Sequence, residues 1–303
     1  MSVLVVLNPW AGRGRGAKAR NLVVRALKDS GVRYDLVETT GPGHAIGLTR
    51  EAVASGVTKL IAASGDGTIH EIANALLQLP PAEDGGTPAA VGCVPLGTGN
   101  DYAKLVGVHG LPPEVAVSRM LHAHSHLFDV GKVHGEYFDN LFGIGFDAEV
   151  QRHANKIRRL KGLAVFLTAI YRTFITFRAP HLEIVSSEHR ESGPMMMVAV
   201  NIGVCGGGGF YLTPQADPTD GKLDVCAIRK VGLLTFLLAV PKVMNGTHGQ
   251  LDQVTLYQSR SVLVRSLDGR PLAMQLDGEL REPNVTEVEI TIEPARLRAL
   301  VAS

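Results

Sequence analysis

Three glycine-bearing turns, each lying between a short apolar run and a segment of helical periodicity, constrain the fold of this chain more than any other feature. They span residues 8–14, 64–68 and 96–101. An alternation of apolar runs and helical segments is typical of a parallel sheet with crossover helices. Loops at the carboxyl ends of such strands meet on one side of the sheet, so we expect all three turns to line one site.

A different pattern begins near residue 126, where short runs of alternating hydrophobicity become frequent. This pattern is typical of antiparallel sheet, and helical segments near residues 151–177 and 231–246 interrupt it. At 303 residues the chain is about twice the usual domain length. The sequence predicts an α/β N-terminal domain over 1–126, with a mostly parallel sheet and flanking helices, and a strand-rich domain over 127–292.

Charge and apolar content limit the function classes. The formal net charge of +1 argues against a nucleic-acid partner that depends on a wide basic face. The cysteines at 93, 205 and 226 are widely spaced and lie in apolar stretches, so we expect reduced core residues. The N-terminus does not resemble a signal peptide, and the longest apolar runs are too short to cross a bilayer. We expect a cytoplasmic protein that meets any lipid from the membrane surface.

The glycine turns have the composition of phosphate-binding loops. Glycine allows close backbone approach, and successive N–H groups beside a helix N-terminus form a concavity suited to phosphate. For any one turn, a plain chain reversal is the simpler interpretation, but three together favour a nucleotide site. Asp66 within such a loop indicates a metal-bound nucleotide or a proton acceptor, although Asp66 and Asp101 also suit the first turn of a helix.

Several segments carry a family resemblance. Residues 64–71 (SGDGTIHE) are similar to the Gly-Gly-Asp-Gly-Thr signature of the diacylglycerol kinase catalytic domain family, which includes sphingosine, ceramide and bacterial lipid kinases. Asn8-Pro9 with Gly12, residues 95–103 (PLGTGNDYA) and residues 277–279 (DGE) stand in the family's order. Ser64 departs from the pattern, because the family usually has glycine there.

The resemblance implies a lipid kinase of phospholipid biosynthesis that uses ATP and Mg²⁺, most simply converting diacylglycerol to phosphatidic acid. It implies a C-terminal β-sandwich-like domain, a nucleotide cleft between the domains, and completion of the first domain by residues 293–303. By matching position, the residues implied to surround ATP are Asn8, Pro9, Trp10, Ala11, Gly12, Thr39, Ser64, Gly65, Asp66, Gly67, Thr68, Ile69, His70 and Thr98.

The resemblance also implies Glu279 as the general base for the lipid hydroxyl, with Asp277 orienting it or helping to hold Mg²⁺, and with Asp66 as the rival base. A structural Mg²⁺ site is implied at Asp217, Asp220 and the carbonyl of Lys222. From the residues alone, both acidic segments are ordinary turns.

Other interpretations remain open at this point. His122, His124 and His126 alternate as if on one strand face, and we favour an exposed strand entrance over a metal site. The basic cluster at 156–161 suits a solvated helix end better than a lipid-docking site. Alternative functions are a sphingoid-base or other lipid kinase, an NAD kinase, or a non-catalytic nucleotide-binding regulator. The expected partner is a membrane lipid, nucleic acid is not expected, and a homodimer is left open.

Overall fold

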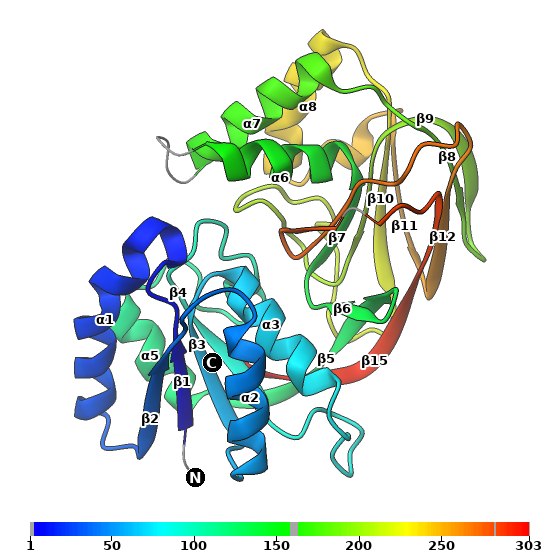
Figure 1. Ribbon diagram of the computed structural model, residues 1–303. Coiled ribbons are helices and arrows are strands. Elements are labelled where there is room, and N and C mark those ends of the chain that lie inside the picture. Colours follow the sequence, from blue (N-terminus) through cyan, green and yellow to red (C-terminus); the bar gives the residue numbers. More distant parts are fainter. Residues whose placement is uncertain (1–2, 158–162, 282, 303) are drawn as a thin grey trace. The chain divides into compact units, whose positions relative to one another are not determined.

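The computed structural model describes residues 3–157, 163–281 and 283–302. Its internal contacts divide the chain into two units, of which the first is Met1–Asp129 with Pro294–Ser303 and the second is Val130–Glu293 (Figure 1). Strands β5 (His124–Val133) and β15 (Glu287–Val301) pass from one unit to the other. Within the described ranges, no helix has the length and apolar character needed to cross a bilayer.

The first unit is built on a parallel sheet. Its strands are β1 (Val3–Leu7), β2 (Tyr34–Glu38), β3 (Lys59–Ser64) and β4 (Ala90–Pro95). They lie in the order β2-β1-β3-β4, and β15 adds to the edge of β4 through Ala299 and Val91. The chain runs from β1 to the edge strand β2, and then crosses back over β1 to form β3 on its other side. Such a reversal is the point at which open α/β sheets bind ligands, outside the carboxyl ends of the strands.

Helices cover both faces of this sheet (Figure 1). Helices α1 (Ala11–Asp29) and α5 (Pro113–His122) pack together on one face, and α2 (His44–Ala54) and α3 (Asp66–Leu77) pack together on the other. All residues of β1 are buried, as the continuous apolar run predicts. Helix α1 ends at Asp29, and Gly31 follows with a φ of +67°, a left-handed conformation that glycine adopts readily after a helix. The short helix α4 spans Tyr102–Leu105.

The second unit is a β-sandwich-like domain. One sheet has the order β14-β13-β7-β9-β10-β11, and β9 also joins a second sheet with β8, β12 and β15. The strands not yet bounded are β6 (Glu136–Phe138), β7 (Leu141–Gly145), β8 (His181–Val185), β9 (Arg190–Asn201), β10 (Leu223–Arg229), β11 (Val254–Ser259), β12 (Ser261–Ser266), β13 (Met274–Leu276) and β14 (Glu279–Arg281). Buried side chains of both sheets, such as Phe142, Val200, Ile184 and Val264, form one core between them.

Helices cover the outer face of the first of these sheets. They are α6 (Phe146–Lys156), α7 (Leu163–Thr176) and α8 (Leu233–Met244), and a single turn of 3₁₀ helix follows at His248–Gln250. A second apolar cluster joins them to the strands through residues such as Phe146, Val165 and Met197. The helical segment expected at 151–177 begins earlier, at Phe146. Of the predicted basic cluster, Arg158, Arg159 and Lys161 lie outside the described residues.

The prediction that His122, His124 and His126 share one strand face is wrong for His122. His122 is the last residue of α5, where its Nδ1 lies 2.8 Å from the carbonyl oxygen of Ser118, and only His124 and His126 belong to β5. Helical periodicity persists through His122, so the strand begins two residues later than the alternation indicates. Among the described residues there is no group of three or more histidine, cysteine or acidic side chains able to hold a metal ion. The three cysteines are all buried and form no disulfide.

Candidate active site

The first glycine turn leaves β1 through an unusual backbone. Gly12, Arg13 and Gly14 all have left-handed conformations, with φ values of 56°, 62° and 86°. Close packing requires glycine at one position in this turn and at one just after it: a Cβ on Gly12 would lie 2.1 Å from the carbonyl oxygen of Leu96, and a Cβ on Gly16 would lie 1.9 Å from that of Asn8. The turn is therefore folded tightly against itself and against the third turn.

The second and third turns touch backbone to backbone. A Cβ on Gly65 would meet the Cα of Gly97 at 2.9 Å, and a Cβ on Gly97 would meet the Cα of Gly65 at 2.5 Å. Hydrogen bonds extend the contact to the first turn: Arg15 Nη1 donates to the Gly97 carbonyl at 3.2 Å, and Asn8 Nδ2 donates to Thr68 Oγ1 at 3.0 Å. The prediction that all three turns meet at one edge of the sheet is confirmed.

Ser64, the departure from the family pattern, fits without strain. It is the last residue of β3, is fully buried, and pairs with Pro95 of β4. Its carbonyl accepts the Leu96 N–H at 2.8 Å, as in a regular parallel ladder. Its φ is not positive, so serine costs the loop no left-handed conformation.

Thr39 stands at the carboxyl end of β2, on the same edge of the sheet. Its side chain is 4% exposed, and its Oγ1 has no hydrogen-bond partner among the described residues. A buried hydroxyl without a partner is costly, so it indicates a place where a ligand group or water belongs. Thr98 and Trp10 are exposed on the neighbouring turns, with Trp10 60% accessible. These residues fit the nucleotide position that the family resemblance implies.

Helix α3 gives the other implied nucleotide residues different surroundings. Ile69 and His70 are buried, which suits support of the loop better than contact with a ligand. Glu71 accepts the backbone N–H groups of Gly43 at 2.7 Å and Ala45 at 3.1 Å, which satisfies orphan donors at the start of α2. The sequence did not predict these two hydrogen bonds, because no short-range pattern connects residue 71 with residue 43.

Two carboxylates border the loops. One oxygen of Asp66 and one of Asp101 each lie 3.1 Å from the point where a Cβ on Gly99 would sit, so they are separated by at most twice that distance. The other Asp66 oxygen accepts the Tyr102 N–H at 3.1 Å, and Asp101 pairs with Lys104 at 2.7 Å. Carboxylate oxygens are among the ligands that Mg²⁺ prefers.

In the second unit, the Asp277-Gly278 pair forms the turn of the β13–β14 hairpin. The φ values of 47° and 87° at Asp277 and Gly278 are those of a type I′ turn, so the hairpin alternative was right about local structure. The buried Asp277 carboxylate accepts three backbone N–H groups, from Asp139 at 3.1 Å, Asn140 at 3.0 Å and Leu141 at 2.9 Å. Glu279, the next residue but one, is exposed.

A second set of bonds fixes the same turn to α6. Gln275 of β13 accepts the Gly278 N–H at 2.6 Å through its side-chain oxygen and donates to Asp147 of α6 at 2.6 Å through its amide nitrogen. With the Asp277 bonds, this anchors both sides of the turn. Glu279 is therefore an exposed carboxylate on a rigid platform.

The segment at Asp217 and Asp220 is a turn whose carboxylates accept local donors. Asp217 Oδ1 accepts the backbone N–H and the hydroxyl of Thr219 at 2.9 and 2.6 Å, and Asp220 accepts the Lys222 N–H at 3.0 Å. Burial raises the pKa of the nearby Asp224 carboxyl to about 6, and the negative charges of Asp220 and Asp217 add to that rise. Carboxylate and carbonyl oxygens are the ligands that Mg²⁺ takes, so Asp217, Asp220 and Lys222 have the donor chemistry of the implied site, but the described residues include no group of three or more acidic side chains placed to hold a metal ion.

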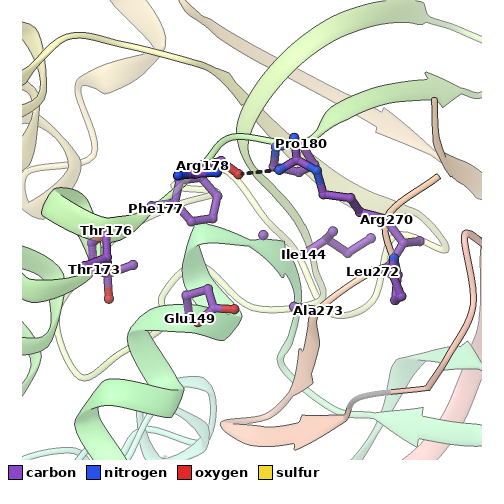
Figure 2. A pocket seen from close by; sticks show the side chains of 12 residues that line it. Ile144, Glu149, Thr173, Thr176, Phe177, Arg178, Pro180, Arg270, Leu272 and Ala273 are labelled. Atoms are coloured by element: carbon purple, nitrogen blue, oxygen red, sulfur yellow. Dashed lines mark hydrogen bonds between the residues drawn. The ribbon is translucent and has the colours of Figure 1, made fainter. Parts of the chain in front are cut away.

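The second unit also contains a pocket of about 290 Å³ (Figure 2). Its wall includes the end of β7, helices α6 and α7, and the segment before β13. The lining residues include Ile144, Glu149, Thr173, Thr176, Phe177, Arg178 and Arg270. An Arg270 N–H donates to the Arg178 carbonyl at 3.3 Å across one side. The sequence did not predict this pocket, since its lining comes from three stretches that are far apart in the chain, within 144–149, 173–180 and 270–273.

A two-domain chain with glycine loops at the switch point of a parallel sheet, followed by a β-sandwich-like domain, matches two known domain families in order. Residues 2–133 match the diacylglycerol kinase catalytic domain, and residues 141–301 match the YegS C-terminal NAD kinase beta sandwich-like domain. The chain belongs to the diacylglycerol kinase family that includes the YegS-like lipid kinases.

Individual proteins agree with this assignment. The chain is 28% identical to a diacylglycerol kinase of Mycobacterium tuberculosis over 98% of its own length and 94% of that protein. It is 32% identical to a Pseudomonas fluorescens protein named "Probable lipid kinase YegS-like" over 85% of the chain and 87% of the relative. The crystal structure of a proposed diacylglycerol kinase from Bacillus anthracis shares the fold with a TM-score of 0.80 and 24% identity, covering 99% and 95% of the two chains.

Proposed function

We propose that this protein is an ATP- and Mg²⁺-dependent kinase that phosphorylates a membrane lipid, with diacylglycerol as the acceptor and phosphatidic acid as the product. The observation that carries the proposal is the contact between three glycine turns at the carboxyl ends of β1, β3 and β4, beside the buried hydroxyl of Thr39, which has no hydrogen-bond partner among the described residues. Membership of the kinase family supports the reaction class, and relatives named diacylglycerol kinase support the acceptor.

The nucleotide is assigned to the first unit. When bound, Mg·ATP supplies the transferable phosphoryl group and the positive charge that the transfer requires. Backbone N–H groups of the turns and the N-terminus of α3 would bind the phosphates of the nucleotide. The hydroxyls of Thr39 and Thr98 would form hydrogen bonds at the edge of the nucleotide. Asp66, with Asp101 beside it, would hold the metal.

Glu279 is proposed as the general base that accepts the proton of the lipid hydroxyl while that oxygen attacks the γ-phosphorus. Its exposure and the anchored turn beneath it support this role, because a base must be positioned and accessible. Both oxygens of Asp277 are engaged with backbone donors, so its proposed role is to position the turn. Asp66 stays as the alternative base.

The pocket in the second unit is proposed to receive the polar part of the acceptor. Ile144 and Phe177 give it apolar walls, and Thr173, Glu149 and Arg270 give it polar groups, which is the composition of small-molecule sites. A structural Mg²⁺ is proposed at Asp217, Asp220 and the Lys222 carbonyl, where it would offset the repulsion on Asp224.

Incubation of the protein with labelled ATP, Mg²⁺ and one acceptor at a time is the direct test of the proposed reaction. The acceptor arms are diacylglycerol, a sphingoid base, ceramide and NAD, and we expect labelled phosphatidic acid in the first. Label in the NAD arm alone would make the protein an NAD kinase. The protein has a single tryptophan, and it lies in the first glycine turn, so Trp10 fluorescence reports nucleotide binding separately. Nucleotide binding without a product in any arm would favour the regulatory alternative.

Glu279→Gln serves as the matched control for chemistry. It should bind nucleotide as the parent does, because Glu279 lies outside the unit that carries the turns, and it should form at least a hundredfold less product, within the usual range for loss of a general base. Asp66→Asn should instead weaken the effect of Mg²⁺ on nucleotide binding. Near-normal turnover of either variant would remove that residue from its proposed role.

A further inference from the structure

Helix α8 has an apolar surface that the second unit leaves in solvent. None of its twelve residues, all within the described part of the chain, is buried. The exposed fractions of Leu233, Leu234, Leu237 and Leu238 are 53%, 73%, 54% and 64%. These leucines recur at a spacing of four, so they form one stripe along the helix. A helix that is apolar in this way is normally covered by protein or membrane.

Helix α7 presents a second stripe of the same kind. Tyr171 is 62% exposed and Ile175 is 65% exposed, and they are one turn apart. On another side of α7, the Phe174 ring packs against Phe236 of α8 with centroids 4.4 Å apart. Figure 1 accordingly draws the two helices next to each other. We call Tyr171, Ile175, Leu233, Leu234, Leu237 and Leu238 together the α7–α8 apolar surface.

The charges on these helices have one sign. Neither α7 nor α8 contains aspartate or glutamate, and their charged residues are Arg172 and Lys242. Lys230 and Arg178 stand just outside the helices, and both are exposed. Basic side chains beside exposed leucine and tyrosine match the surface of an anionic bilayer, where each cation adds attraction. Two copies of this surface would instead place like charges against each other.

The pocket gives a second reason to choose a bilayer, and this reason rests on the proposed lipid acceptor. Thr173, Thr176 and Phe177, in or directly after α7, line the 290 Å³ pocket. That volume is at the lower end of the range for sites that bind small molecules, about 300–1,000 Å³. It can hold the polar end of a two-chain lipid but not both acyl chains. The chains must then stay in the bilayer, and α7 must lie at its surface.

We propose that the α7–α8 apolar surface is the membrane-docking face of this protein and that it inserts among the headgroups of an anionic phospholipid bilayer. The choice of partner rests on the proposed function in one respect, that the acceptor is a lipid. The exposed stripes and the single sign of charge stand without it. Docking requires neither nucleotide nor turnover, so binding and catalysis can fail separately.

Vesicle flotation of the full chain without nucleotide tests the surface. The vesicles contain phosphatidylcholine alone or mixed with phosphatidylglycerol, and we expect binding mainly to the mixture and weaker binding at high salt. Leu234→Asp with Leu238→Asp should lower the partition coefficient more than tenfold. Leu267→Asp is the matched control, because Leu267 is 49% exposed in the same unit but outside the two helices. It should bind as the parent does.

Activity separates docking from chemistry. The double variant should phosphorylate a water-soluble short-chain diacylglycerol within twofold of the parent, but long-chain diacylglycerol in vesicles more than tenfold more slowly. The docking proposal would be overturned if the double variant bound vesicles as well as the parent does. It would also be overturned if the parent formed a dimer and did not bind vesicles, and the double variant were monomeric. If vesicle binding is lost as expected but the parent phosphorylates no lipid, docking is supported and the proposed function fails.

Discussion

Replacing Asp277 by asparagine should damage stability, whereas replacing its neighbour Glu279 by glutamine should not. Asp277 is 8% exposed and accepts three backbone N–H groups, while Glu279 is exposed. Asparagine tolerates the left-handed φ of 47° at this position. The substitution therefore changes the hydrogen bonds and leaves the turn geometry accessible.

The magnitude follows from the three donors. The amide oxygen of asparagine can keep the bonds from Asn140 and Leu141, but both become neutral and lose part of their strength. The amide nitrogen replaces the oxygen that faces the Asp139 N–H, and a buried donor without an acceptor costs about 1–3 kcal/mol. Together we expect a loss of about 2–4 kcal/mol. Glu279→Gln should stay within about 0.5 kcal/mol of the parent, as exposed substitutions do.

Chemical denaturation followed by circular dichroism measures both variants, and calorimetry resolves the unit that unfolds. Asp277→Asn should lower the melting temperature of the second unit by about 4–16 °C, given a loss of about 2–4 kcal/mol and the size of that unit. Turnover should show the reverse order, with Glu279→Gln the more impaired. If Asp277→Asn lies within about 1 kcal/mol of the parent, the carboxylate does not hold the turn and the positioning argument fails.

Three further outcomes follow from single contacts. Gly97→Ala should lose about 1–3 kcal/mol of folding stability and most of its nucleotide binding, because its Cβ would lie 2.5 Å from a backbone atom of Gly65. Gly47 has open space around it, so Gly47→Ala should fold and bind normally in the same melting and fluorescence assays. Thr39→Val should lower nucleotide affinity a few fold without loss of stability, since its hydroxyl has no partner to lose among the described residues. The pKa of Asp224 is raised to about 6, so the unfolded chain releases that proton at a lower pH than the folded chain does, and stability falls as pH rises from about 4 to 6. In Asp224→Asn, after allowance for solvent screening, that fall in stability should be about 1–2 kcal/mol smaller. Thermal melts measured across this pH range check the difference.

The meeting of the glycine turns at one edge of the first unit could be predicted because its determinants are local. Each turn follows a buried strand and precedes a helix, and parallel topology brings the carboxyl ends together. The contact between Gly65 and Gly97 shows why glycine stands at both positions, since either Cβ would strike the other backbone. The φ of Ser64 could not be predicted, because serine is compatible with both a strand end and a left-handed turn; the pairing with Pro95 decides it.

The features of the second unit depend on contacts between distant segments, which leave little mark on the sequence. Asp277 binds residues 139–141, and Gln275 binds Asp147, across more than a hundred residues in each case. The sequence predicted a turn at 277–279 but offered no reason to separate the roles of its two acids. Their exposure and hydrogen bonds now favour a structural role for Asp277 and leave Glu279 available for chemistry.

Helices α7 and α8 illustrate a different limit. Their apolar composition, taken alone, fits a core helix as well as a surface helix, because hydropathy does not state what covers a side chain. The structure distinguishes the two: Phe174 and Phe236 pack inward while Leu234 and Tyr171 remain in solvent. A soluble substrate would give selection no reason to keep such leucines exposed, since they favour aggregation. A substrate held in a bilayer gives one, because a membrane-docking face would bring the proposed pocket to its acceptor.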